Sequence, residues 1–242
     1  DVALQNLDVT FGIDRAGLVG QDGPTHHGAF DLSYLPCIPN LVIGAPSDEN
    51  ECRQMLYTAY LHPGPAVVRY PRGTGNGVKI EDEMQAMEIG RSIQLIAGKD
   101  VAILNFGTLL PVAQDVATTL GATLVDMRWV KPMDNARVLK IAKQHGLVVT
   151  LEDNVIISGP GASVAQLLAT NSASTHVLNF GIPDRFIDHG AIEQLRHDAK
   201  IDRDYILRTI GEKLAEIDYL CRDGEAQKKQ PTPESKTQRA SW

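Results

Sequence analysis

The stretch from Asn40 to Tyr70, NLVIGAPSDENECRQMLYTAYLHPGPAVVRY, decides the fold. Its two apolar runs, Asn40–Ala45 and Pro65–Tyr70, predict buried strands. Between them, Ser47 is a good N-cap for a helix, and the acidic residues that follow suit the positive end of the helix dipole. A strand, a helix and a second strand in this order are typical of a βαβ unit, in which helices cover a parallel sheet.

The same alternation continues on both sides of this unit. Upstream, Leu7–Asp14 predicts another buried strand. Downstream, Asp134 is a predicted N-cap, while Gly121 and Gly146 are predicted to close two helices. The predicted strands there are 101–106, 123–127, 147–151 and 176–180, and the predicted helices are 109–120, 135–145, 158–168, 191–196 and 204–217. These elements predict a second α/β domain, followed by a tail from Cys221 whose polar composition predicts disorder.

Composition argues against several classes of protein. Hydrophobic residues make up 43% and charged residues 22%, as in an ordinary globular protein. Lys and Arg number 23 against 30 Asp and Glu, and the resulting net charge of −7 disfavours nucleic acid or an anionic membrane as a general partner. No apolar run approaches the roughly 18 residues that a transmembrane helix needs. The three cysteines lack CxxC spacing, so we expect neither disulfides nor a zinc site. A cytoplasmic location fits this cysteine content.

Residues suited to chemistry gather in the loop 14–34, DRAGLVGQDGPTHHGAFDLSY. The loop follows a predicted strand, and ligands of open α/β sheets bind where loops leave the carboxyl ends of strands. Its glycines let the backbone turn tightly, while Asp22 and His26 can exchange protons near neutral pH. This loop is therefore the first candidate for a site.

A second polar stretch, VRYPRG, ends another predicted strand. Its Arg72 is expected to be free to point into the same crevice as Arg15. Two guanidinium groups in one crevice suit a phosphate, although a single arginine more often pairs with a surface carboxylate. Glu152 and Asp153 also lie at a strand end, where we expect a structural or domain-interface role.

These runs resemble the 1-deoxy-D-xylulose-5-phosphate synthase family. The matching segments are DRAGLVGQDGPTHHGAFDLSYL, IPNLVIGAPSDENECRQML, VRYPRG, LNFGTLLPVAQ…LVDMRWVKPMD and VVTLEDNVIISGPGASV. Transketolases and the beta subunits of 2-oxoacid dehydrogenases share looser versions and are kept as alternatives. A non-catalytic assembly module is a third alternative, although such a module would have no need for these polar groups together.

The resemblance implies an α/β fold with a partial pyrimidine-binding, parallel-sheet domain followed by a transketolase C-terminal α/β domain. Residues 1–77 would be the C-terminal half of the pyrimidine-binding domain, and 78–91 a linker. Residues 92–218 would form the C-terminal domain, and 219–242 a polar tail.

The activity that the resemblance implies is the condensation of pyruvate with D-glyceraldehyde 3-phosphate, with loss of CO₂, on thiamine diphosphate and Mg²⁺. The product would serve the biosynthesis of isoprenoid precursors, thiamine and pyridoxal. Arg15 of the DRAG motif and Arg72 of the YPRG motif would bind the acceptor's phosphate. Asp22 would hydrogen-bond an acceptor hydroxyl, and His26 would help to bind substrate and handle protons. The adjacent His27 is given no role.

The resemblance also indicates what to expect outside this sequence. The family's catalytic glutamate lies well upstream of the DRAG arginine, and no GDG…N motif for Mg²⁺ and diphosphate occurs here. The sequence also begins Asp-Val-Ala-Leu, without Met. We therefore expect no cofactor or metal ligands in this chain, and no catalysis by it alone. Its expected partners are the N-terminal part of the same enzyme and a second copy in a homodimer.

Overall fold

The structure is a computed structural model that describes residues 1–228. Asp1–Leu207 form one unit with two sheets, and a second unit begins at Arg208. The strands are β1 (Thr10–Ile13), β2 (Val42–Gly44), β3 (Ala66–Arg69), β4 (Ile93–Ile96), β5 (Val101–Phe106), β6 (Thr123–Asp126), β7 (Trp129–Lys131), β8 (Leu147–Val155) and β9 (His176–Ile182). The helices are α1 (Asp31–Tyr34), α2 (Glu49–Leu61), α3 (Leu110–Leu120), α4 (Asn135–Gln144), α5 (Pro160–Thr170), α6 (Ile192–Asp198) and α7 (Arg203–Lys228).

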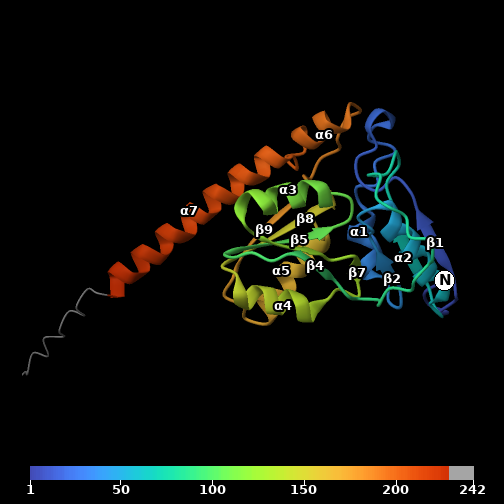
Figure 1. The fold of residues 1–242 in the computed structure, drawn as a ribbon, viewed down its shortest axis with the longest axis horizontal. Helices are drawn as coiled ribbons and strands as arrows, with labels where there is room; N and C mark the ends of the chain where they lie inside the picture. Colours follow the sequence, from blue (N-terminus) through green and yellow to red (C-terminus); the bar gives the residue numbers. More distant parts are fainter. Residues whose placement is uncertain (229–242) are drawn as a thin grey trace, which may run out of the picture. The chain divides into compact units, whose positions relative to one another are not determined.

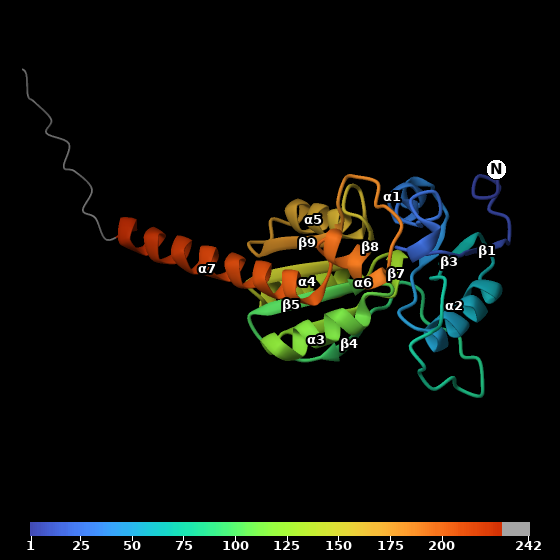
Figure 2. The ribbon, with the colours of Figure 1, turned by 90° about the horizontal axis from the view of Figure 1, so that it is seen from above.

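The first sheet has the strand order β1-β3-β2-β7 (Figures 1 and 2). Strand β3 lies parallel to both β1 and β2, and α2 packs against β1 and β3. The predicted βαβ unit is therefore confirmed. Because parallel neighbours end at the same edge of a sheet, the loops that follow β1 and β3 emerge side by side.

Strand β1 differs from the prediction of a buried strand over Leu7–Asp14. Only Thr10–Ile13 form a strand, and three of its residues are exposed, with Phe11 at 38%. The reason is its position at the edge of the sheet, where it pairs with β3 alone. Its other side offers unpaired backbone groups, which make an edge strand a template for further pairing.

The N-terminus of α2 is capped by Asp48, not by Ser47 as predicted. The Asp48 carboxylate accepts a hydrogen bond from the Glu51 backbone N–H at 2.8 Å. Ser47 instead donates its N–H and its hydroxyl to the Glu51 carboxylate, at 2.9 and 3.0 Å. Asp and Ser are both good N-caps, so the sequence alone does not show which of these two adjacent residues caps the helix. The Asp48 carboxylate also interacts favourably with the helix dipole.

The second sheet has the order β4-β6-β5-β8-β9, in which β4 alone is antiparallel to its neighbour. Figure 1 shows α3 on one face and α4 and α5 on the other. The predicted caps are confirmed at two of these helices. Gly121 ends α3 in the left-handed conformation at φ 62°, and the Asp134 side chain accepts from the Arg137 N–H at 3.0 Å to begin α4.

Two strands were not predicted, and one of them joins the two predicted domains. Strand β7 follows β6 closely in the chain, yet it pairs antiparallel with β2 in the first sheet. A cluster of buried apolar side chains likewise combines Ile43 and Val67 of the first sheet with Leu104 of the second. The predicted domains therefore share one core.

The segment predicted as a linker, 78–91, contains no helix or strand but is tied to α2. Arg53 donates to the Glu81 carbonyl at 2.9 Å, and Thr58 accepts from the Met87 N–H at 2.8 Å. Gln54 accepts from the Gln85 N–H at 2.6 Å. Side chains of one helix thus replace the backbone pairing that the segment lacks.

The predicted disordered tail is wrong for its first residues. Helix α7 continues through Lys228, past the expected end at Ile217. Glu225, Ala226 and Gln227 are strong helix formers, so a low aliphatic content does not prevent a helix here. The rest of the predicted tail, 229–242, lies outside the described residues. No helix within residues 1–228 has the length and apolarity required to cross a membrane.

Candidate active site

The loop after β1 is held in shape by its own backbone. Gly28 donates its N–H to the Arg15 carbonyl at 2.9 Å, and its carbonyl accepts from the Gly17 N–H at 2.9 Å. A Cβ at position 28 would lie 2.3 Å from the Arg15 oxygen, so only glycine fits this close approach. The loop is also joined to the end of β3, because Ala16 donates its N–H to the Tyr70 carbonyl at 3.0 Å.

The structure brings together two of the predicted site residues. Arg72, after β3, forms an ion pair through Nη1 with the Asp22 carboxylate. Both residues also keep contact with solvent, with side-chain exposures of 53% for Arg72 and 28% for Asp22. The pair lies where the loops after β1 and β3 meet.

The other two predicted residues make only local contacts. Arg15 pairs with its neighbour Asp14, and its Nε is buried without a hydrogen-bond partner. Exposed His26 has its Nδ1 at 2.9 Å from the Thr25 hydroxyl. The protein surface thus leaves both side chains available to a ligand, but does not bond them to Arg72 or Asp22.

His27, which was given no role, supports the loop. Its Nδ1 accepts a hydrogen bond from the Val19 N–H at 3.0 Å, and its Nε2 lies 3.3 Å from the Asp188 carbonyl. These partners require a neutral ring that carries its proton on Nε2. The segment before α6 is thereby fastened to the loop, over a separation of 161 positions in the chain.

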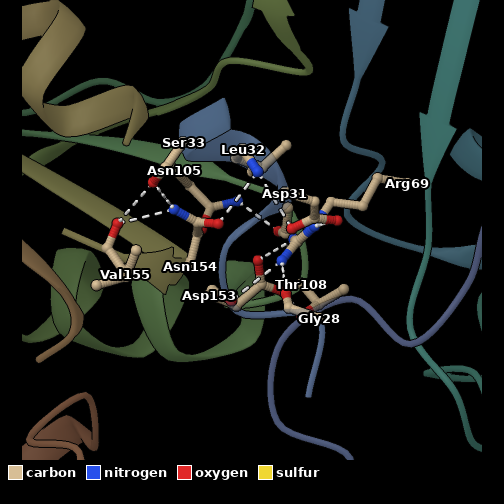
Figure 3. A network of polar contacts seen from close by, with 11 residues as sticks. Gly28, Asp31, Leu32, Ser33, Arg69, Asn105, Thr108, Asp153, Asn154 and Val155 are labelled. Carbon is tan, nitrogen blue, oxygen red and sulfur yellow. Dashed lines mark hydrogen bonds and ion pairs between the residues drawn. The ribbon is translucent and has the colours of Figure 1, made fainter. Parts of the chain in front are cut away.

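A buried polar network centres on Arg69, which was not predicted from the sequence (Figure 3). Arg69 is 1% exposed and forms ion pairs with Asp31, at 2.8 Å, and with Asp153. Its Nη2 donates to the Gly28 carbonyl at 2.6 Å, and Asp153 also accepts from the Thr108 hydroxyl. The network therefore anchors the loop 14–28 to both sheets, and Asp153 takes the interface position expected for it.

Glu152 lies beside this network as a buried acid. It is fully buried, accepts from the Gly161 N–H at 2.9 Å, and leaves Oε2 without a partner. Burial raises the pKa of Glu152 to about 8. Burial, with the negative charge of Glu51, raises the pKa of Asp126 to about 8 as well. Burial therefore favours the protonated form of both acids near neutral pH.

Replacing Glu152 with glutamine is expected to flatten the pH dependence of stability. Between about pH 4.5 and pH 8 the folded protein keeps a proton on Glu152 that the unfolded chain releases, so wild-type stability falls as pH rises. Glutamine imitates the protonated acid and removes the contribution of Glu152 to this decline, so the variant should gain about 1 kcal/mol relative to wild type for each pH unit within the window. Urea unfolding at both ends of the window measures this, and parallel pH profiles would contradict it.

The expectation that this chain carries no ligands for Mg²⁺ or the diphosphate stays a prediction. Within 1–228, no three His, Cys, Asp or Glu side chains converge as a set able to hold a metal. The pocket of about 220 Å³ beside the start of α2 is lined by the carboxylates of Asp48 and Glu49, which would repel a diphosphate. The polar groups near Arg72 suit an anionic substrate instead.

Two family models match the chain. The pyrimidine binding domain of transketolase matches residues 1–76, and the transketolase C-terminal domain matches residues 90–206. The two matches together cover most of the chain, and both are to domains of transketolase. The predicted fold class, a pyrimidine-binding domain followed by a transketolase C-terminal domain, is thereby confirmed.

Curated relatives carry the name suggested by the sequence motifs. The 1-deoxy-D-xylulose-5-phosphate synthase of Cellvibrio japonicus is 54% identical over 215 residues, which cover 89% of this chain and 34% of the relative. That of Alcanivorax borkumensis is 55% identical over 214 residues, covering 88% of this chain and 33% of the relative. The resemblance is confirmed, and the chain spans about a third of the length of these relatives.

Solved transketolase structures share the fold. A split-gene transketolase, described as an inactive beta4 tetramer, superposes with a TM-score of 0.75 at 25% identity and covers 88% of this chain and 68% of its own. The transketolase of Campylobacter jejuni gives a TM-score of 0.67 at 17% identity, covering 87% of this chain and 32% of its own.

Proposed function

We propose that this chain supplies the acceptor-binding part of a 1-deoxy-D-xylulose-5-phosphate synthase, a transferase of the transketolase type. The enzyme would condense pyruvate with D-glyceraldehyde 3-phosphate and release CO₂. The observation that carries the proposal is the meeting of Arg72 and Asp22 at the neighbouring ends of β3 and β1, within two motifs shared with this family. The identity of more than half to synthases from two bacteria supports it further.

In this proposal each predicted residue acts on the acceptor. Arg15 and Arg72 bind the phosphate, since guanidinium groups can grip phosphate oxygens in pairs. Asp22 accepts a hydrogen bond from an acceptor hydroxyl while it also orients Arg72. His26, on the exposed side of the loop, binds substrate and transfers a proton as the acceptor carbonyl becomes an alkoxide.

The rest of the catalytic apparatus would come from other parts of the enzyme. Thiamine diphosphate, which the family uses, and Mg²⁺ would be held by residues that this chain does not provide. The exposed edge of β1 is suited to pairing with a further strand, which supports assembly with an N-terminal part. We further propose a cytoplasmic homodimer that is inactive without that part, in line with the inactive tetramer of the split-gene transketolase.

The proposal is tested by replacing Arg72 with alanine in the active assembly. One lost charge-assisted phosphate contact costs about 1.5–3 kcal/mol, so the KM for D-glyceraldehyde 3-phosphate should rise about 10- to 100-fold. The KM for pyruvate should change little, because pyruvate carries no phosphate. Steady-state kinetics with each substrate varied separately measures both.

The control is Arg91→Ala, which removes an exposed arginine paired with Glu88 and should leave both constants unchanged. Equal increases in both KM values for Arg72→Ala would contradict the proposal that Arg72 binds the acceptor's phosphate. An active assembly that transfers units from a ketose phosphate and ignores pyruvate would instead favour a transketolase.

A further inference from the structure

A pocket of about 320 Å³ opens beside Arg72. Its walls come from the loop after β1, the segment after β3, the start of α3 and the helix α6. We propose that Arg196, on α6, is a further phosphate-binding residue of this acceptor site. The inference rests on the proposed function and adds a residue from the C-terminal domain to it.

Of the two arginines that line this pocket, Arg196 is the one that has no partner among residues 1–228. Arg72 is paired with Asp22, and the carboxylate of Asp153, which also lines the pocket, is neutralised by buried Arg69. Within residues 1–228, by contrast, the half-buried Arg196 side chain makes no ion pair or hydrogen bond. Glu193 also lines the pocket, on the exposed first turn of α6, and does not pair with Arg196.

The position of α6 is set by close packing against the loop 14–34. Gly190 donates its N–H to the Gly20 carbonyl at 3.2 Å. A Cβ on Gly20 would lie 3.4 Å from Ile192 Cδ1, and one on Gly23 would lie 3.2 Å from the His189 side chain. The loop that carries Asp22 and the helix that carries Arg196 are therefore packed closely together, as a preorganised binding site requires.

A phosphate monoester matches this arrangement. Its two negative charges and its acceptor oxygens can be shared between guanidinium groups that reach it from two walls, one after β3 and one on α6. A short aldehyde bearing such a phosphate would place its uncharged carbonyl end away from the arginines. Arg196 thus favours phosphorylated over unphosphorylated acceptors.

The test compares Arg196→Ala with wild type in the active assembly, using D-glyceraldehyde 3-phosphate and unphosphorylated D-glyceraldehyde as alternative acceptors. The KM for the phosphorylated aldehyde should rise about tenfold, as expected from the loss of one charge-assisted contact. The KM for D-glyceraldehyde should stay constant, a separation that a purely structural role would not produce. Arg196→Lys should recover part of the loss, and Arg196→Gln replaces the alanine variant if that variant does not fold.

Two further variants serve as controls. Arg72→Ala removes the phosphate-binding arginine of the proposed function, and Arg91→Ala removes an exposed arginine and should change no KM value. If Arg72→Ala raises the KM for D-glyceraldehyde 3-phosphate but not that for D-glyceraldehyde, and Arg196→Ala changes neither, the inference is overturned and the proposed function stands. If Arg196→Ala raises both KM values equally, its role is structural and the inference is again overturned. If neither Arg72→Ala nor Arg196→Ala changes the KM for D-glyceraldehyde 3-phosphate, the proposed function fails together with the inference.

Discussion

Replacing Arg69 with methionine is expected to lower the free energy of unfolding by about 3–5 kcal/mol. Arg69 is 1% exposed, and methionine would leave Asp31 and Asp153 buried without a counterion. Removing one partner of a buried ionic network is costly because the remaining charges have lost their water and gain nothing in return. Urea unfolding of wild type and variant at neutral pH measures the loss.

Two further variants separate this effect from the general loss of an arginine. Arg91→Met removes an exposed ion pair with Glu88 and should leave the free energy of unfolding nearly unchanged. Combining Arg69→Met with Asp31→Asn and Asp153→Asn removes the stranded charges and should restore part of the stability. A loss below about 1 kcal/mol for Arg69→Met alone would show that water reaches the network and that the carboxylates are not isolated.

Replacing His26 with alanine should lower kcat by about 10²-fold or more in the active assembly. The reason is that a positioned proton donor or acceptor contributes this much when a carbonyl becomes an alkoxide. His26 is exposed and its ring contacts only the Thr25 hydroxyl, so the fold should survive the change. Single-turnover kinetics, with the melting temperature as a check on folding, measures the effect.

Two other histidines provide the controls. His197 lies on α6, outside the loop 14–34, and its side chain is 72% exposed, so His197→Ala should leave kcat unchanged. His27→Ala should instead loosen the loop, because it removes the ring that receives the Val19 N–H. Hydrogen exchange of the loop amides would report this. An unchanged kcat for His26→Ala would exclude His26 from proton transfer.

Where the sequence predicted the fold correctly, the deciding signals are local. Strand β5 was predicted at its observed bounds from a run of apolar residues, and Gly121 and Asp134 mark helix ends through contacts within a few residues. The prediction failed where neighbours in space decide. Strand β1 reads as a buried strand, but it lies at a sheet edge, and no feature of its own residues indicates that.

The residues of the candidate site likewise fall into those predicted from the sequence and those found only in the tertiary structure. The sequence by itself determined the family resemblance and predicted Arg15, Asp22, His26 and Arg72 as site residues, because they stand in motifs that are contiguous in the chain. Only the tertiary structure decided that Arg69 is buried between two carboxylates, and that Arg196 shares a pocket with Arg72. Those contacts join positions far apart in the chain. Their strength depends on burial and on distance in space, which local composition does not encode.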